Sequence, residues 1–170
     1  MDRVALLALT APAWLLLSGA QGLRNDFDGR VLAAHNRERA AVGVEPLRWS
    51  PALARDAAGW ARELAATRTF EHSPDEGGGE PQGENLFMGT AGAFAPEAMV
   101  AAWADEKKHY KAGVFPNVSR TGDYADVGHY TQLAWANTRE VGCALAGDGA
   151  DEYLVCRYTR AGNVQGERAF

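Results

Sequence analysis

Apolar residues recur at helical spacing in three long segments of the chain. Residues 26–42, 51–67 and 96–111 each carry an apolar stripe, with charged residues largely on the opposite side. Gly43 follows the first segment as a helix-ending residue. Ser50-Pro51 opens the second, with serine as the cap and proline in the first turn. The pattern therefore predicts three helices.

Shorter apolar runs predict strands between and after these helices. Residues 140–146 and 152–159 are rich in strand-forming residues and flank the turn-prone segment 147–151, which predicts an antiparallel hairpin. Residues 83–87 are predicted as a further short strand, and residues 129–135 as a short helix. Helices combined with a few strands predict an α+β fold, but the pattern alone leaves the order of the layers open.

The N-terminal segment has the composition of a targeting sequence. Residues 4–17 form an apolar run, preceded by Arg3 and followed by the small residues Ser18-Gly19-Ala20. This order predicts a secretory signal peptide over residues 1–22, cleaved after Ala20 or Gly22. The run is too short for a transmembrane helix, which needs about 20 apolar residues, although an uncleaved N-terminal anchor is an alternative. We expect a secreted, periplasmic or extracellular protein that is not an integral membrane protein.

Export gives the two cysteines a structural interpretation. Cys143 and Cys156 are the only cysteines, so only one intramolecular pairing exists. Each lies in one of the two strands of the predicted hairpin, which would bring them side by side, and an oxidising compartment favours a disulfide bond. Two reduced buried thiols are the alternative.

Size and charge narrow the classes of function. The 170 residues indicate one domain, and 46% hydrophobic residues are enough for an ordinary core. The net charge is −5, and the chain has no lysine- or arginine-rich run. We therefore expect no nucleic-acid partner.

Several motifs spread along the chain resemble those of the CAP superfamily, which comprises cysteine-rich secretory proteins, antigen 5 and plant pathogenesis-related 1 proteins. The two longest motifs are family signatures, and the shorter ones precede them in the expected order. These motifs are Gly128-His129-Tyr130-Thr131-Gln132-Leu133-Ala134-Trp135, the run from Tyr153 to Val164, His35-Asn36-x-x-Arg39, Leu47-x-Trp49, His72-Ser73 and Gly83-Glu84-Asn85-Leu86.

The resemblance implies a fold and a domain range. It implies a three-layer α/β/α sandwich with a small antiparallel sheet, spanning residues 27–166. One cysteine pair without a cysteine-rich C-terminal extension is similar to the stand-alone, single-domain type of the family.

The resemblance also implies a cavity lined by two histidines and two acids. By motif these are His72, Glu84, Glu106 and His129. Tyr130, Gln132 and Asn85 are expected at or beside the cavity wall. His35 is expected to have a structural role, and His109 is set aside because the family motif carries only the neighbouring glutamate.

The chemistry of these residue types agrees with a metal site. Neutral imidazole nitrogens are good ligands for Zn²⁺, and carboxylates orient the rings through the second nitrogen. Two histidines do not complete a coordination shell, so water or another ligand would fill the remaining positions. Without metal, the four side chains would form a hydrogen-bonded polar cluster.

These observations leave several functions open. One is a secreted module whose cavity binds a divalent cation, most readily Zn²⁺, with a lipid, sterol or extracellular protein as a further ligand. The alternative is a metal-dependent hydrolase or protease in which Glu84 or Glu106 acts as general base. A purely structural envelope protein with a vestigial cavity is a third hypothesis.

Overall fold

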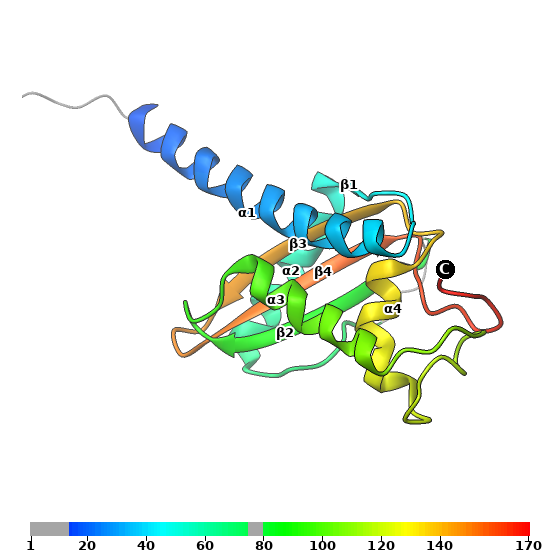
Figure 1. The fold of residues 1–170 in the computed structure, drawn as a ribbon. Coiled ribbons are helices and arrows are strands. Elements are labelled where there is room, and N and C mark those ends of the chain that lie inside the picture. Colours follow the sequence, from blue (N-terminus) through cyan, green and yellow to red (C-terminus); the bar gives the residue numbers. More distant parts are fainter. Residues whose placement is uncertain (1–13, 75–79) are drawn as a thin grey trace, which may run out of the picture.

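The described residues of the domain form four α-helices and four strands (Figure 1). The structure, a computed structural model, describes residues 14–74 and 80–170, with side chains from residue 26 onward. The signal peptide predicted over residues 1–22 lies largely outside the described residues and stays a prediction. Among the described residues, no helix combines the length and the apolar character needed to span a bilayer.

The helices follow the apolar pattern, with differences at their ends. Their bounds are α1 Trp14–Ala41, α2 Pro51–Thr67, α3 Pro96–Ala104 and α4 Gly128–Ala134. The first helix begins before residue 26, where the sequence placed its start. The third does not continue to residue 111, because the chain tightens into a 3₁₀ helix, η1 (Asp105–Lys108). A second 3₁₀ turn, η2 (Tyr124–Val127), precedes α4.

The strands form one mixed sheet in the order β1-β3-β4-β2. The hairpin is built from β3 (Glu140–Gly147) and β4 (Asp151–Thr159), and β2 (Gly83–Thr90) pairs antiparallel with β4. The sequence analysis missed β1 (Arg48–Trp49), which pairs in parallel with β3. The sheet is therefore mostly, but not wholly, antiparallel, and β2 lies at one edge.

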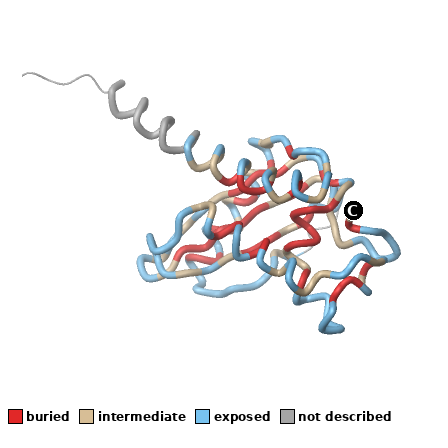
Figure 2. Tube along the Cα trace, in the orientation of Figure 1, coloured by how far each residue is buried: buried red, intermediate tan, exposed pale blue. Residues whose placement is uncertain are grey.

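The sheet is covered on both faces, which gives the predicted α/β/α layers. On one face, α2 packs Ala61 and Leu64 against Leu86, Tyr153 and Val155. On the other face, apolar residues of α1, α3 and α4 pack against alternate residues of β3 and β4, including Leu154 and Cys156. Figure 2 shows the buried residues concentrated in the strands and on the inner sides of the helices.

The predicted disulfide is confirmed. Cys143 and Cys156 are directly opposite each other in the β3–β4 hairpin, and their sulfur atoms are bonded. Both cysteines are buried in the core below α1, α3 and α4. The bridge therefore joins the two central strands of the sheet.

Candidate functional site

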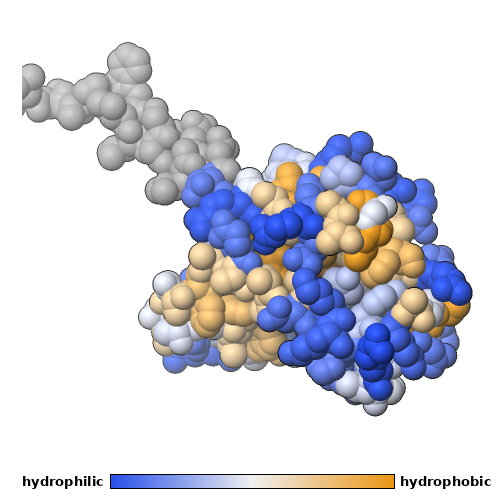
Figure 3. All heavy atoms as spheres, viewed as in Figure 1, coloured by the Kyte–Doolittle hydropathy of each residue, from blue (hydrophilic) through white to orange (hydrophobic). Residues whose placement is uncertain are grey.

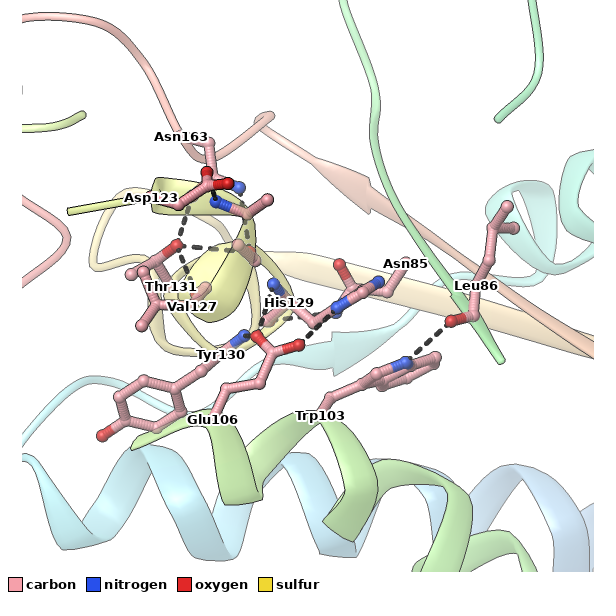
Figure 4. A network of polar contacts seen from close by, with 12 residues as sticks. Asn85, Leu86, Trp103, Glu106, Asp123, Val127, His129, Tyr130, Thr131 and Asn163 are labelled. Carbon is pink, nitrogen blue, oxygen red and sulfur yellow. Dashed lines mark hydrogen bonds and ion pairs between the residues drawn. The ribbon is translucent and has the colours of Figure 1, made fainter. Parts of the chain in front are cut away.

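One half of the site is the pair formed by Glu106 and His129. Glu106 lies in η1, directly after α3, and His129 is the second residue of α4. Glu106 Oε1 is 2.6 Å from His129 Nδ1, and Glu106 Oε2 accepts hydrogen bonds from the backbone nitrogens of His129 (3.0 Å) and Tyr130 (3.1 Å). Figure 4 shows the Glu106 carboxylate pointing at the start of α4. One carboxylate therefore caps a helix and orients the histidine that the helix carries.

The other half is the pair formed by His72 and Glu84. Glu84 lies near the start of β2, and its Oε1 is 2.7 Å from His72 Nδ1 and 3.0 Å from the backbone nitrogen of Ser73. Its second oxygen is 3.0 Å from Arg157 Nε, an ion pair whose angle does not give a hydrogen bond. The Glu84 side chain is buried, whereas 64% of the His72 side chain is exposed. A buried carboxylate thus holds an exposed imidazole in place.

Both pairs leave the same ring nitrogen available. A carboxylate accepts hydrogen bonds, so Nδ1 of each ring donates its proton and Nε2 of a neutral ring carries a lone pair. Among the described residues, neither Nε2 has a hydrogen-bond partner. When neutral, each histidine is therefore held in the tautomer that a metal ligand requires.

The charges of the His72–Glu84 pair reinforce each other. The hydrogen bond to Glu84 raises the pKa of His72 above 6.5, although partial burial opposes this. Burial by itself raises the pKa of Glu84, but the hydrogen bonds from His72 and Ser73 and the charge of Arg157 together bring it below 4.5. Charged His72 and ionised Glu84 therefore favour each other.

These shifts predict how the pair responds to pH in the metal-free protein. We expect Glu84→Gln to lower the pKa of His72 towards 6.5, as measured by NMR titration of the ring. The stabilising effect of the pair should be largest between about pH 4.5 and 6.5. It declines above this window because the imidazolium loses its proton, and below it because the carboxylate gains one. Urea unfolding of both proteins across this range measures the difference.

The matched control is Glu71→Gln, which removes an exposed carboxylate next to His72 in sequence. This variant should leave the titration of His72 as it is in the unmodified protein. An unchanged His72 titration in Glu84→Gln would contradict the pairing.

The two pairs lie on either side of β2. Successive residues of a strand point to opposite faces, so Glu84 and its cross-strand neighbour Arg157 lie on the α2 face, while Asn85 lies on the face of α1, α3 and α4. Asn85 Nδ2 donates to the backbone oxygen of His129 at 3.1 Å. Within residues 14–74 and 80–170, no group of three or more His, Cys, Asp or Glu side chains is placed to hold a metal ion. The single four-residue cavity stays a prediction.

The residues expected at the cavity wall are largely buried. Tyr130 packs against the rings of Tyr110 and Phe170. Gln132 Oε1 accepts from the backbone nitrogen of Gly162 at 2.7 Å, and its Nε2 donates to Thr138 at 3.3 Å. These contacts position α4, and the place of both residues in a cavity wall stays a prediction.

Sequence reasoning missed two neighbours of the site. Arg157 is placed on Glu84 by the pairing of β2 with β4, a register that the sequence does not reveal. Trp103 lies nearly parallel to the His129 ring, with centroids 6.2 Å apart. The expected structural role of His35 is confirmed, since its ring is buried and bonded to Val31 and Tyr158.

Comparisons with known proteins agree with this architecture. Residues 32–158 match the cysteine-rich secretory protein family, CAP. The chain is 36% identical over 146 residues to pathogenesis-related protein PR-1 of Medicago truncatula, covering 85% of this chain and 79% of that protein. It is 37% identical over 146 residues to the human Golgi-associated plant pathogenesis-related protein 1, covering 85% and 89%. A crystal structure of NaASP2 with Zn²⁺ shares the fold with a TM-score of 0.69 and 23% identity, covering 84% of each chain.

Proposed function

The chain belongs to the cysteine-rich secretory protein (CAP) family, and we propose that it is an exported protein that binds a divalent cation, most readily Zn²⁺, through His72 and His129. One observation carries the proposal: each histidine donates Nδ1–H to a carboxylate and leaves Nε2 free. Carboxylate–histidine pairs of this kind orient imidazole ligands and increase their basicity.

In this proposal, the cation lies at the edge of β2. Glu84 and Asn85 belong to an edge strand, and the two histidines flank its first residues from opposite faces. A cation shared by both rings would therefore lie beyond this free edge, with water in the remaining coordination positions. Zn²⁺ supplies Lewis-acid chemistry when it is bound. The solved structure of NaASP2 with Zn²⁺ supports the choice of metal.

The carboxylates support binding rather than hydrolysis. A general base must be free to take a proton from water. Glu106 already accepts three hydrogen bonds, and Glu84 accepts two and pairs with Arg157. Both acids are thus already engaged in orienting the histidines, which favours a binding role over the alternative of a general base in a metal-dependent hydrolase.

One groove of the described residues, between α1 and α3, does not suit a buried sterol or lipid. The groove between α1 and α3 has a volume of about 260 Å³, and four of its six lining residues are charged. Arg30 bridges it through two hydrogen bonds to Glu97 of 2.6 and 2.7 Å. Figure 3 shows hydrophilic surface along this part of α1. Sites for apolar ligands are usually larger and lined mostly by apolar side chains.

Calorimetric titration of the metal-free protein with zinc chloride tests the proposal. We expect His72→Ala combined with His129→Ala to abolish measurable binding, and Glu106→Gln to weaken it about 10- to 100-fold. His109→Ala is the matched control, because it removes an imidazole outside both pairs. Unchanged affinity in the double variant, or loss of affinity in the control, would overturn the proposal.

A further inference from the structure

Three buried polar side chains form a connected group behind His129. Asn85, Tyr158 and His35 are each at most 1% exposed, and they come from β2, β4 and α1. Buried polar groups are costly unless they are hydrogen-bonded, so their bonds determine how they lie. None of the three is a proposed ligand of the cation.

The direction of these hydrogen bonds follows from His35. Its Nδ1 is 2.8 Å from the Val31 carbonyl oxygen, which only accepts, so Nδ1 carries the proton. Burial lowers the pKa of His35 to about 4, so the ring is neutral near pH 7 and Nε2 accepts. The Tyr158 hydroxyl, 2.8 Å away, therefore donates to Nε2.

Asn85 joins this group to the site. Asn85 and Tyr158 are diagonal neighbours on the same face of the paired strands β2 and β4. Burial raises the pKa of Tyr158, whereas the Asn85 side chain lowers it by a hydrogen bond. A hydrogen bond that favours the phenolate is one in which the amide donates to the phenol oxygen. The same amide nitrogen donates to the His129 backbone oxygen at 3.1 Å. Because an amide nitrogen carries two hydrogens, one NH₂ group can connect Tyr158 with His129.

A second contact runs through aromatic rings. Trp103 is a neighbour of both histidines, with its ring centroid 6.1 Å from that of His35 and 6.2 Å from that of His129. Its Nε1 donates to the Leu86 backbone oxygen at 2.9 Å, which holds the indole in place (Figure 4). The indole that is stacked on His129 is thus also a neighbour of the imidazole that accepts from Tyr158.

We propose that Tyr158 is a positioning residue for His129, acting through Asn85 on the backbone and through His35 and Trp103 on the face of the imidazole. Glu106 fixes Nδ1 of the ring, and the Tyr158 group fixes where α4 presents that ring. The inference rests on the metal-binding function proposed above, because it makes Tyr158 one of the residues that determine where His129 lies in that site.

Tyr158→Phe tests the inference, because it removes only the hydroxyl. We expect Zn²⁺ affinity to fall about tenfold, at the lower end of the effect of partners outside the coordination shell, because Tyr158 acts through other residues. The visible spectrum of bound Co²⁺ should change as well. In the metal-free protein, the NMR signal of the His129 Nδ1 proton should broaden or exchange faster with water. Tyr153→Phe is the matched control, since Tyr153 is a buried tyrosine of the same strand that faces α2.

A double-mutant cycle separates positioning from general stability. Asn85→Leu breaks the same connection at its last step, so adding Tyr158→Phe to it should weaken Zn²⁺ binding by clearly less than tenfold further. If Tyr158→Phe does not fold, the same measurements on Asn85→Leu test the connection to His129, and we expect the same loss of Zn²⁺ affinity. Unchanged Zn²⁺ affinity and an unchanged His129 proton signal, measured well below the unfolding temperature, would overturn the inference. If the unmodified protein binds no metal, the proposed function fails, while the His129 proton signal still tests the positioning.

Discussion

Replacing Arg39 with leucine is expected to destabilise the protein by about 4 kcal/mol, among the largest effects of any single substitution. The Arg39 side chain is fully buried, and it donates to four backbone oxygens. These belong to Glu45 (2.8 Å), Leu133 (3.0 Å), Trp135 (2.9 Å) and Thr138 (3.1 Å). Leucine would leave these oxygens without their charged donor inside the protein, where an unpaired polar group is costly.

The position of these oxygens explains why a guanidinium is needed. Leu133 and Trp135 lie at the C-terminal end of α4, where carbonyl groups lack partners within the helix and favour a positive charge. Burial, together with repulsion from Arg139, lowers the pKa of Arg39 to about 10, so it still carries its charge at pH 7. Lysine has the charge but not the planar fork, and we expect Arg39→Lys to cost about 2 kcal/mol.

Urea unfolding measures both variants. Arg37→Leu is the matched control, because Arg37 is exposed on the same helix, and we expect a change within about 0.5 kcal/mol. A cost below about 1 kcal/mol for Arg39→Leu would show that water replaces the guanidinium as donor. That result would contradict the interpretation of Arg39 as the group that fixes the end of the helix carrying His129.

The parts of the fold that depend on local sequence patterns could be predicted from the sequence. The start of α2 at Ser50-Pro51 and the β3–β4 hairpin follow from capping and turn residues, and the pairing of Cys143 with Cys156 follows from that hairpin. By contrast, β1 has only two residues, too few for a periodic pattern, and pairs with a strand about 90 residues away. The end of α3 at Ala104 was also missed, since Lys107, Lys108 and the residues after them continue to look helical.

In the site, too, the residues named by local motifs could be predicted, whereas contacts between distant segments could not. The motifs named both glutamates and both histidines, and the structure forms each histidine–glutamate pair. The position of Arg157 beside Glu84 depends on strand register, and the path from His35 to Asn85 depends on three elements packing together. Such contacts are tertiary, so residue type and spacing do not specify them.

The second large loss of stability is expected from a substitution at Gly142, a residue of β3. The sequence pattern does not explain why this position is a glycine. A Cβ atom added there would lie 2.2 Å from the Ala54 backbone nitrogen and 2.5 Å from the Ser50 backbone oxygen. Both contacts are with the backbone of the first turn of α2, which cannot rotate away as a side chain can. Gly142→Ala should therefore push α2 off the sheet and cost about 3 kcal/mol or more.

A second glycine, in α2 itself, is expected to change the free energy of unfolding in the opposite direction when it is replaced by alanine. Gly59 lies in the middle of α2, and a Cβ added there has nothing within 4 Å. Alanine is favoured over glycine inside a helix by about 0.5 to 1 kcal/mol, so Gly59→Ala should stabilise the same helix that Gly142→Ala displaces. Urea unfolding of the two variants should give free-energy changes of opposite sign. If Gly142→Ala were as stable as the unmodified protein, the close approach of α2 to β3, and with it the position of the α2 layer, would be wrong.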